Sequence, residues 1–161
     1  MDVKSAFLHG DLHEEIYMEQ PPDFIHNDSS LVCFLKKSLY GLKQAPRAWY
    51  AKMDNSLLTT GFSRCHSDNT VYTKRVDGQL IILVLYVDDL ILTSSDPKLI
   101  NHVKSSLKQK FDMTDLGYLH YFLGLQVLQS KEGISLSQSK YDHDLLHCSH
   151  MEDCKPTPSP F

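Results

Sequence analysis

The sequence lacks the features of a secreted or membrane-spanning protein. Its longest apolar run, residues 80–87, is far shorter than the ~20 residues that a transmembrane helix needs. Its first residues show no charged segment followed by an apolar one, so no signal sequence is recognised. Its four cysteines form no Cys-X-X-Cys pair, which favours reduced thiols. We therefore expect an intracellular protein, cytoplasmic or nuclear, with no membrane partner.

The chain also has little net charge. Its 161 residues carry a formal charge of −4, which excludes a uniformly basic nucleic-acid-binding protein. With 42% hydrophobic and 22% charged residues, disorder and coiled coil are excluded as the main state. The length is that of one domain with a real core.

Charge is nevertheless segregated along the chain. Residues 1–35 hold seven acids and one base, whereas residues 36–75 hold eight bases and two acids. Residues 76–97 hold four acids and no base, and residues 98–110 hold four lysines and no acid. An acidic centre between basic segments is typical of a metal site that acts on a phosphate-bearing ligand. Solvated faces of alternating sign would give the same pattern.

Hydrophobic periodicity predicts an α+β protein. Apolar side chains recur at three- and four-residue steps after Pro46 and after Asp96-Pro97, which predicts helices ending near Gly61 and Phe111. A third helix is expected from Ser139. Strands are expected at 1–8, 32–35, 71–75, 80–87, 90–93, 121–128 and 134–137. The order of these elements favours a mostly antiparallel sheet with helices packed on one face.

Asp88-Asp89 is the feature that points most directly to chemistry. The two carboxylates lie between two apolar strands, where they repel each other and lose solvation. A divalent cation would relieve both costs, although a plain Asp-Asp turn remains the alternative. Asp2, at the edge of another expected strand, would supply a third carboxylate. Three carboxylates can hold two Mg²⁺ ions ~3.5–4 Å apart, and Mn²⁺ can take their place.

Four blocks of the sequence carry a family resemblance. They are Met-Asp-Val-Lys-Ser-Ala-Phe-Leu-His-Gly-Asp-Leu (1–12), Ser-Leu-Tyr-Gly-Leu-Lys-Gln-Ala-Pro-Arg-Ala-Trp-Tyr (38–50), Tyr-Val-Asp-Asp (86–89) and Asp-Leu-Gly-Tyr-Leu-His-Tyr-Phe-Leu-Gly-Leu-Gln-Val (115–127). In this order they resemble the reverse transcriptase domain of Ty1/copia-type retrotransposons. The resemblance covers almost the whole chain.

This resemblance implies the palm of an RNA-directed DNA polymerase. Asp2, Asp88 and Asp89 match the family's catalytic, metal-binding aspartates. The cofactor would be two Mg²⁺ ions, and the partners would be an RNA template, a DNA primer and deoxynucleoside triphosphates.

The resemblance also assigns binding residues. Those expected to contact nucleotide or template are Phe7, Gly41, Lys43, Gln44 and Tyr86, and those of a primer-grip hairpin are Tyr121, Phe122 and Gly124. Phe7 would block a ribose 2′-hydroxyl sterically. For Phe7, Tyr121 and Phe122, ordinary packing is the alternative. We interpret Trp49 as a helix core residue rather than a base-stacking platform.

The sequence departs from the family at its ends. It opens on the first catalytic motif, so the fingers, ribonuclease H and integrase parts of the polyprotein are expected to be missing. We interpret residues 1–153 as a partial reverse transcriptase domain and residues 154–161 as a proline-rich linker. The alternative function is a catalytically inactive remnant that at most binds nucleic acid, through residues 36–75 and 98–110.

A zinc site near the end of the chain is a further alternative. Histidine and cysteine side chains gather there at spacings that can bind zinc: His143, His147, Cys148, His150 and Cys154. The family's last helix needs no metal at this place. The early histidines, His9, His13 and His26, are expected on surface loops.

Overall fold

The computed structural model describes residues 1–26, 28 and 30–155. These residues divide into two compact units, Met1–Asp115 and a second unit that begins at Leu116. Most of the proline-rich segment expected at 154–161 lies outside the described residues, so the division at residue 153 stays a prediction.

A six-stranded sheet forms the framework of the first unit. Its strand order is β4 (Ser63–Arg64), β5 (Val71–Val76), β6 (Gln79–Tyr86), β7 (Asp89–Ser94), β1 (Asp2–Val3) and β8 (Met113–Thr114). Every neighbouring pair is antiparallel. The predicted antiparallel sheet is therefore confirmed for this unit.

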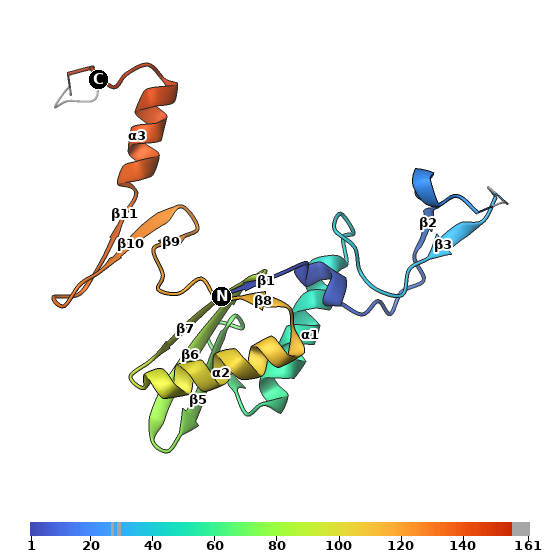
Figure 1. The fold of residues 1–161 in the computed structure, drawn as a ribbon, viewed down its shortest axis with the longest axis horizontal. Coiled ribbons are helices and arrows are strands. Elements are labelled where there is room, and N and C mark those ends of the chain that lie inside the picture. The colour runs from blue at the N-terminus through green and yellow to red at the C-terminus, as the bar shows by residue number, and fades with distance from the viewer. Residues whose placement is uncertain (27, 29, 156–161) are drawn as a thin grey trace. The chain divides into compact units, whose positions relative to one another are not determined.

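Two helices, α1 (Ala45–Thr59) and α2 (Pro97–Lys110), pack against this sheet (Figure 1). In β6 every second residue is fully or almost fully buried, as alternation in a strand requires: Ile81, Leu83 and Leu85. These side chains belong to one hydrophobic cluster with Met53 of α1 and Val103 of α2. Because the cluster is single and uses one side of β6, both helices cover the same face of the sheet, as predicted.

Local signals set the ends of both helices. The Asp96 side chain accepts a hydrogen bond from the Lys98 amide at 2.8 Å and caps α2. At the end of α1, Gly61 has a φ of 87°, and its amide donates to the Leu58 carbonyl while the Phe62 amide donates to Leu57. This is a Schellman motif, which needs the left-handed conformation that glycine adopts without cost.

The first strand is shorter than the alternation predicted. β1 ends at Val3, and Ser5 takes a left-handed φ of 52° before the 3₁₀ helix η1 (Ala6–His9). The expected strand over 1–8 is thus wrong beyond Val3, because Ala6 turns into the core instead of continuing the ladder.

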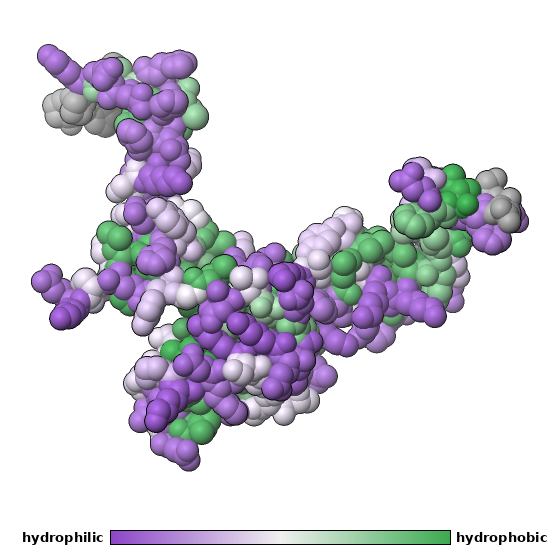
Figure 2. All heavy atoms as spheres, in the orientation of Figure 1, coloured by the Kyte–Doolittle hydropathy of each residue, from purple (hydrophilic) through white to green (hydrophobic). Residues whose placement is uncertain are grey.

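A separate two-stranded sheet joins β2 (Tyr17–Glu19) and β3 (Val32–Phe34), with the 3₁₀ helix η2 (Pro22–Phe24) between them. Hydrophobic side chains gather on its surface (Figure 2). Among the exposed ones are Tyr17, Phe24, Val32 and Phe34. Two strands alone are marginal in water. Across this pair, the ring of Tyr17 packs against that of Phe34 with 5.3 Å between centroids.

The second unit has a three-stranded antiparallel sheet and one helix. The sheet order is β11 (Ile134–Ser137), β10 (Leu125–Gln129) and β9 (Tyr121–Phe122), and α3 spans Ser139–Cys148. The strand expected over 121–128 is broken, because Leu123 and Gly124 both have positive φ and form a two-residue hairpin turn. Among the described residues, no helix is long and apolar enough to cross a membrane.

Candidate active site

The site is built on one cross-strand pair. Asp2 of β1 lies directly opposite Asp89 of β7. The flanking bonds are Leu90 N–H to the Met1 carbonyl at 2.8 Å and Val3 N–H to the Asp88 carbonyl at 2.9 Å. Asp2 and Asp89 are therefore a non-hydrogen-bonded pair, whose side chains project from the same face and approach more closely than in the hydrogen-bonded kind.

Asp88 belongs to the turn beside this pair. Tyr86 pairs with Asp89 across the β6–β7 hairpin, so the turn consists of Val87 and Asp88, whereas the sequence had placed both aspartates in it. Val87 has a φ of 53°, a conformation that is unfavourable for a β-branched residue. Asp89 is instead the first residue of β7, because its backbone pairs with that of Tyr86 across the hairpin.

The three carboxylates interact electrostatically. The pKa of Asp89 is raised from its ordinary value, mainly because burial disfavours its charged form, and further because the charges of Asp88 and Asp2 repel it. The amino terminus of the chain opposes this shift and lowers the pKa. A carboxylate that two like charges oppose is a group that a cation would stabilise.

The donor chemistry fits a hard divalent cation, since Mg²⁺ prefers carboxylate oxygens. Within the described part of the chain, however, no three His, Cys, Asp or Glu side chains are grouped closely enough to hold one metal ion. The backbone thus brings Asp2, Asp88 and Asp89 to one place, while their carboxylates are not gathered around a single point. The same finding covers the histidines and cysteines of residues 143–154.

Phe7 is half-buried and links two of the sequence blocks. Its ring packs on Tyr40 with 4.8 Å between centroids, and it borders the hydrophobic core. Its carbonyl accepts a hydrogen bond from the buried Ser38 hydroxyl. Phe7 therefore packs as a core residue does, and its role against a ribose hydroxyl stays a prediction.

Gly41 occupies a tight turn before α1. The Leu42 amide donates to the Leu39 carbonyl at 3.2 Å, and Gly41 has a φ of 92°, as the third residue of a type II turn requires. A Cβ on Gly41 would meet nothing within 4 Å. Within the chain, glycine is needed here for its backbone conformation and not for a close approach.

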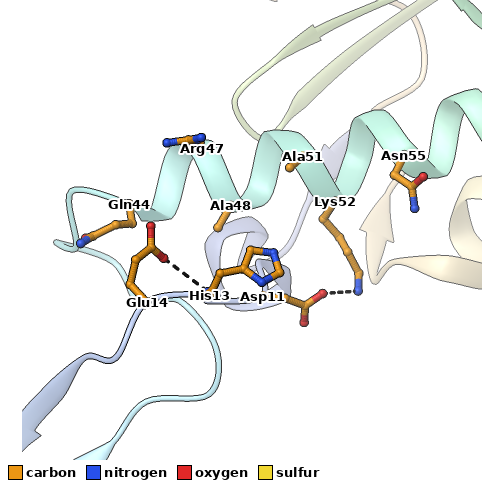
Figure 3. A pocket seen from close by; sticks show the side chains of 9 residues that line it. All are labelled: Asp11, His13, Glu14, Gln44, Arg47, Ala48, Ala51, Lys52 and Asn55. Atoms are coloured by element: carbon orange, nitrogen blue, oxygen red, sulfur yellow. Dashed lines mark hydrogen bonds and ion pairs between the residues drawn. The ribbon is translucent and has the colours of Figure 1, made fainter.

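Gln44 lies at a hollow beside the start of α1 (Figure 3). Its nine lining residues are Asp11, His13, Glu14, Gln44, Arg47, Ala48, Ala51, Lys52 and Asn55. Asp11 and Lys52 form an ion pair across it at 2.7 Å. None of the three aspartates lines this hollow, and Lys43 beside it is exposed. The contacts of Lys43 and Gln44 with a nucleotide stay predictions.

Trp49 makes a contact that the sequence does not predict. It is 1% exposed, which confirms its interpretation as helix core. Its indole N–H also donates a hydrogen bond to the Val87 carbonyl, in the turn beside Asp88. The available signal was general: a buried indole N–H usually has a partner, but the partner's identity depends on the fold.

His9 also differs from its expectation as a surface loop residue. Its ring lies 5.9 Å from that of Trp49 and 5.6 Å from that of Phe111, between centroids. It is half-buried, because η1 places it over this aromatic pair.

The remaining predicted binding residues lie at the end of β6 and in the β9–β10 hairpin. Tyr86 is 48% exposed at the end of β6. Tyr121, Phe122 and Gly124 form the β9–β10 hairpin of the second unit, where Lys140 lies 5.7 Å from the Tyr121 ring centroid. A tight hairpin is therefore present, and its role as a primer grip stays a prediction.

Comparison with known proteins relates the chain to reverse transcriptases and retrotransposon Pol polyproteins. The family model described as reverse transcriptase (RNA-dependent DNA polymerase) matches residues 1–161. The chain is 43% identical over 161 residues to the retrovirus-related Pol polyprotein from transposon RE1 of Arabidopsis thaliana, covering 99% of this chain and 11% of that protein. It is 45% identical over 164 residues to the Pol polyprotein from transposon TNT 1-94 of Nicotiana tabacum, covering 99% and 12%.

A shorter relative is similar as well. The putative transposon Ty5-1 protein of Saccharomyces cerevisiae is 36% identical over 162 residues, with 99% of this chain and 53% of that protein covered. No solved structure matches the chain. The chain thus spans about a tenth of the length of the plant relatives and about half that of the yeast one. It belongs to the reverse transcriptase family, as the reverse transcriptase domain of Ty1/copia-type retrotransposon Pol polyproteins.

Proposed function

We propose that the first unit is the palm of an RNA-directed DNA polymerase, in which Asp2, Asp88 and Asp89 bind two divalent cations. The observation that carries the proposal is the direct pairing of Asp2 with Asp89 across β1 and β7. Residues 87 positions apart in sequence are thereby brought face to face beside the Val87–Asp88 turn. A chance Asp-Asp turn would not need a third carboxylate opposite it.

The chain's own groups have defined parts in this reaction. The side chains of Asp2 and Asp89 project from the same face of the sheet, and with Asp88 they would supply the carboxylate oxygens that hold the cations. Bound Mg²⁺ would lower the pKa of a primer 3′-hydroxyl and neutralise charge on the triphosphate. The 3′-hydroxyl would lose its proton to water, its oxygen would bond to the α-phosphorus, and the bond from the α-phosphorus to the oxygen bridging to the β-phosphate would break, so that pyrophosphate leaves. The substrates would be an RNA template, a DNA primer and deoxynucleoside triphosphates.

The alternative is an inactive remnant that binds nucleic acid through its basic segments. Several cations of residues 36–75 and 98–110 already bond within the fold. They are Lys52 with Asp11, Arg64 with Asp54, Lys74 with the Thr60 carbonyl, Lys104 with Asp115 and Lys110 with the Ser56 hydroxyl. Cations held in this way are less available to phosphates, so binding would be weaker than the charge count of these segments implies.

The test is primer extension on an RNA template by a chimeric polyprotein that contains this chain. Residues 1–161 replace the corresponding segment of the tobacco Pol polyprotein, and the unaltered polyprotein is assayed alongside. We expect the chimera to extend the primer with Mg²⁺, and Asp88→Asn to abolish extension. The control is Asp77→Asn, an exposed aspartate in the turn between β5 and β6. Extension that survives Asp88→Asn at the chimera's rate would refute the catalytic assignment.

A further inference from the structure

Three separate segments of the chain meet around the single tryptophan. η1 reaches it through His9, the end of α2 reaches it through Phe111 at 5.5 Å between ring centroids, and the β6–β7 turn reaches it through the Val87 carbonyl. Among the residues that the structure describes, Trp49 is the buried side chain of α1 that hydrogen-bonds to the turn containing Asp88.

Close packing fixes the position of Trp49. Gly10, which follows η1, lies so near α1 that a Cβ there would be 2.9 Å from the Trp49 amide nitrogen and 2.9 Å from the Ala48 Cβ. The Gly10 carbonyl accepts from the Ser38 amide at 2.9 Å, and the Ser38 hydroxyl bonds back to Phe7. Residues 7–10 therefore pack closely on α1 at the level of Trp49, whose side chain is 1% exposed.

The Val87 turn needs such a support. Val87 adopts a left-handed conformation, which costs of order 1–3 kcal/mol for a non-glycine residue and persists only where its surroundings enforce it. The backbone carbonyl of its neighbour Asp88 accepts a hydrogen bond from the Val3 amide, and this bond ties the turn to β1. The turn is thus held between β1 and the indole of Trp49.

We infer that Trp49 is a positioning residue for the catalytic turn: its indole N–H holds the Val87 carbonyl and so fixes the orientation of Asp88 relative to Asp2 and Asp89. This role rests on the function proposed above. In this role Trp49 acts through the Val87 carbonyl.

The sole tryptophan of the chain makes the inference directly measurable. In a ¹⁵N-labelled sample of the full chain there is one indole N–H resonance, and it reports this hydrogen bond alone. Without metal, we expect slow hydrogen exchange at the indole. In Trp49→Phe, which keeps a ring but removes the donor, the Val3 amide that bonds to Asp88 is expected to exchange about five- to tenfold faster, the effect of one lost hydrogen bond.

The matched control is Tyr50→Phe. This change also removes one α1 side-chain donor, since the Tyr50 hydroxyl bonds to the Asn69 carbonyl at 2.9 Å. It is expected to leave Val3 exchange unchanged. Equal Val3 exchange in Trp49→Phe and wild type, or free exchange of the wild-type indole, would overturn the inference; the wild-type indole decides the matter even if Trp49→Phe fails to fold.

A second arm separates this inference from the proposed function. Mn²⁺ bound at the aspartates is expected to broaden the indole resonance, and Asp88→Asn is expected to abolish that broadening. A protected indole without broadening would leave Trp49 as the support of the turn and refute metal binding. Broadening with an unprotected indole would support metal binding and refute the positioning role.

Discussion

Asp89 is the residue at which stability and the proposed chemistry oppose each other. Burial and the charges of Asp88 and Asp2 raise its pKa in the folded chain. Because the folded state then binds the proton more tightly than the unfolded state, ionisation of Asp89 lowers the free energy of unfolding. This unfavourable contribution is present above the raised pKa and disappears as the pH falls below the ordinary value.

Asp89→Asn is therefore expected to stabilise the chain at neutral pH. It removes a charge that its neighbours oppose while keeping the side chain's shape. The midpoint of thermal unfolding at pH 7 should exceed that of wild type, and the difference should vanish near pH 3. Asp77→Asn, measured by the same calorimetry, is the control. A variant less stable than wild type at pH 7 would contradict this view of the site.

Some residues of the site follow from the sequence, and others do not. The Asp88-Asp89 doublet between apolar strands was enough to locate the hairpin and to suggest a cation. The pairing of Asp2 with Asp89 was only a hypothesis, because spacing does not say which strands become neighbours. The Trp49 bond to Val87 was not predictable, since it depends on how closely α1 packs on the turn.

A polar network that includes the buried side chains of Asp54 and Tyr72 ties α1 to β4 and β5. Asp54 accepts from the Tyr72 hydroxyl at 2.8 Å and pairs with the Arg64 guanidinium, whose Nε lies 2.8 Å away. Tyr72 is completely buried. Its burial, followed by its bonds to Tyr50 and Asp54, raises its pKa far above the ordinary value. A buried hydroxyl of this kind depends on its acceptor.

We expect Asp54→Ala to lower the free energy of unfolding by about 1–3 kcal/mol, because it leaves the Tyr72 hydroxyl without its carboxylate. Tyr72→Phe removes only the hydroxyl and should cost about 1 kcal/mol. Urea unfolding of both single variants and the double variant measures their coupling. Additive losses, with no coupling between the two positions, would show that the network does not join helix and sheet.

The elements that sequence predicted well are those with local signals. Asp96-Pro97 and Gly61 set the ends of α2 and α1 because caps act within one turn. The strand expected over 1–8 failed after Val3, where tertiary packing of Ala6 and the left-handed Ser5 outweighed alternation. The strand over 121–128 failed because Leu123, not a usual turn residue, takes a positive φ.

Among the residues that the structure describes, the main hydrophobic cluster lies in the first unit. All residues of the main cluster fall between Val3 and Met113, and the three aspartates lie within the same limits. The second unit buries little besides Val127 among its described residues. This division into two compact units does not follow from composition, because hydropathy shows which residues are apolar but not which cluster they join.

We therefore expect residues 1–115 to fold without the second unit. Their calorimetric transition should stay cooperative, with a midpoint within a few degrees of that of the full chain. The control is the full chain under the same conditions. Loss of the cooperative transition in residues 1–115 would show that the second unit is required for the core to form.

Asp2, Asp88 and Asp89 are proposed to bind divalent cations together. The direct test of this claim is a Mn²⁺ titration followed by electron paramagnetic resonance. We expect wild type to bind two Mn²⁺ ions, and we expect Asp2→Asn, Asp88→Asn and Asp89→Asn each to weaken binding at least about tenfold, since even an outer-shell partner is worth that much. Asp77→Asn should bind like wild type. If all three aspartate variants bind Mn²⁺ as tightly as Asp77→Asn does, the claim is contradicted.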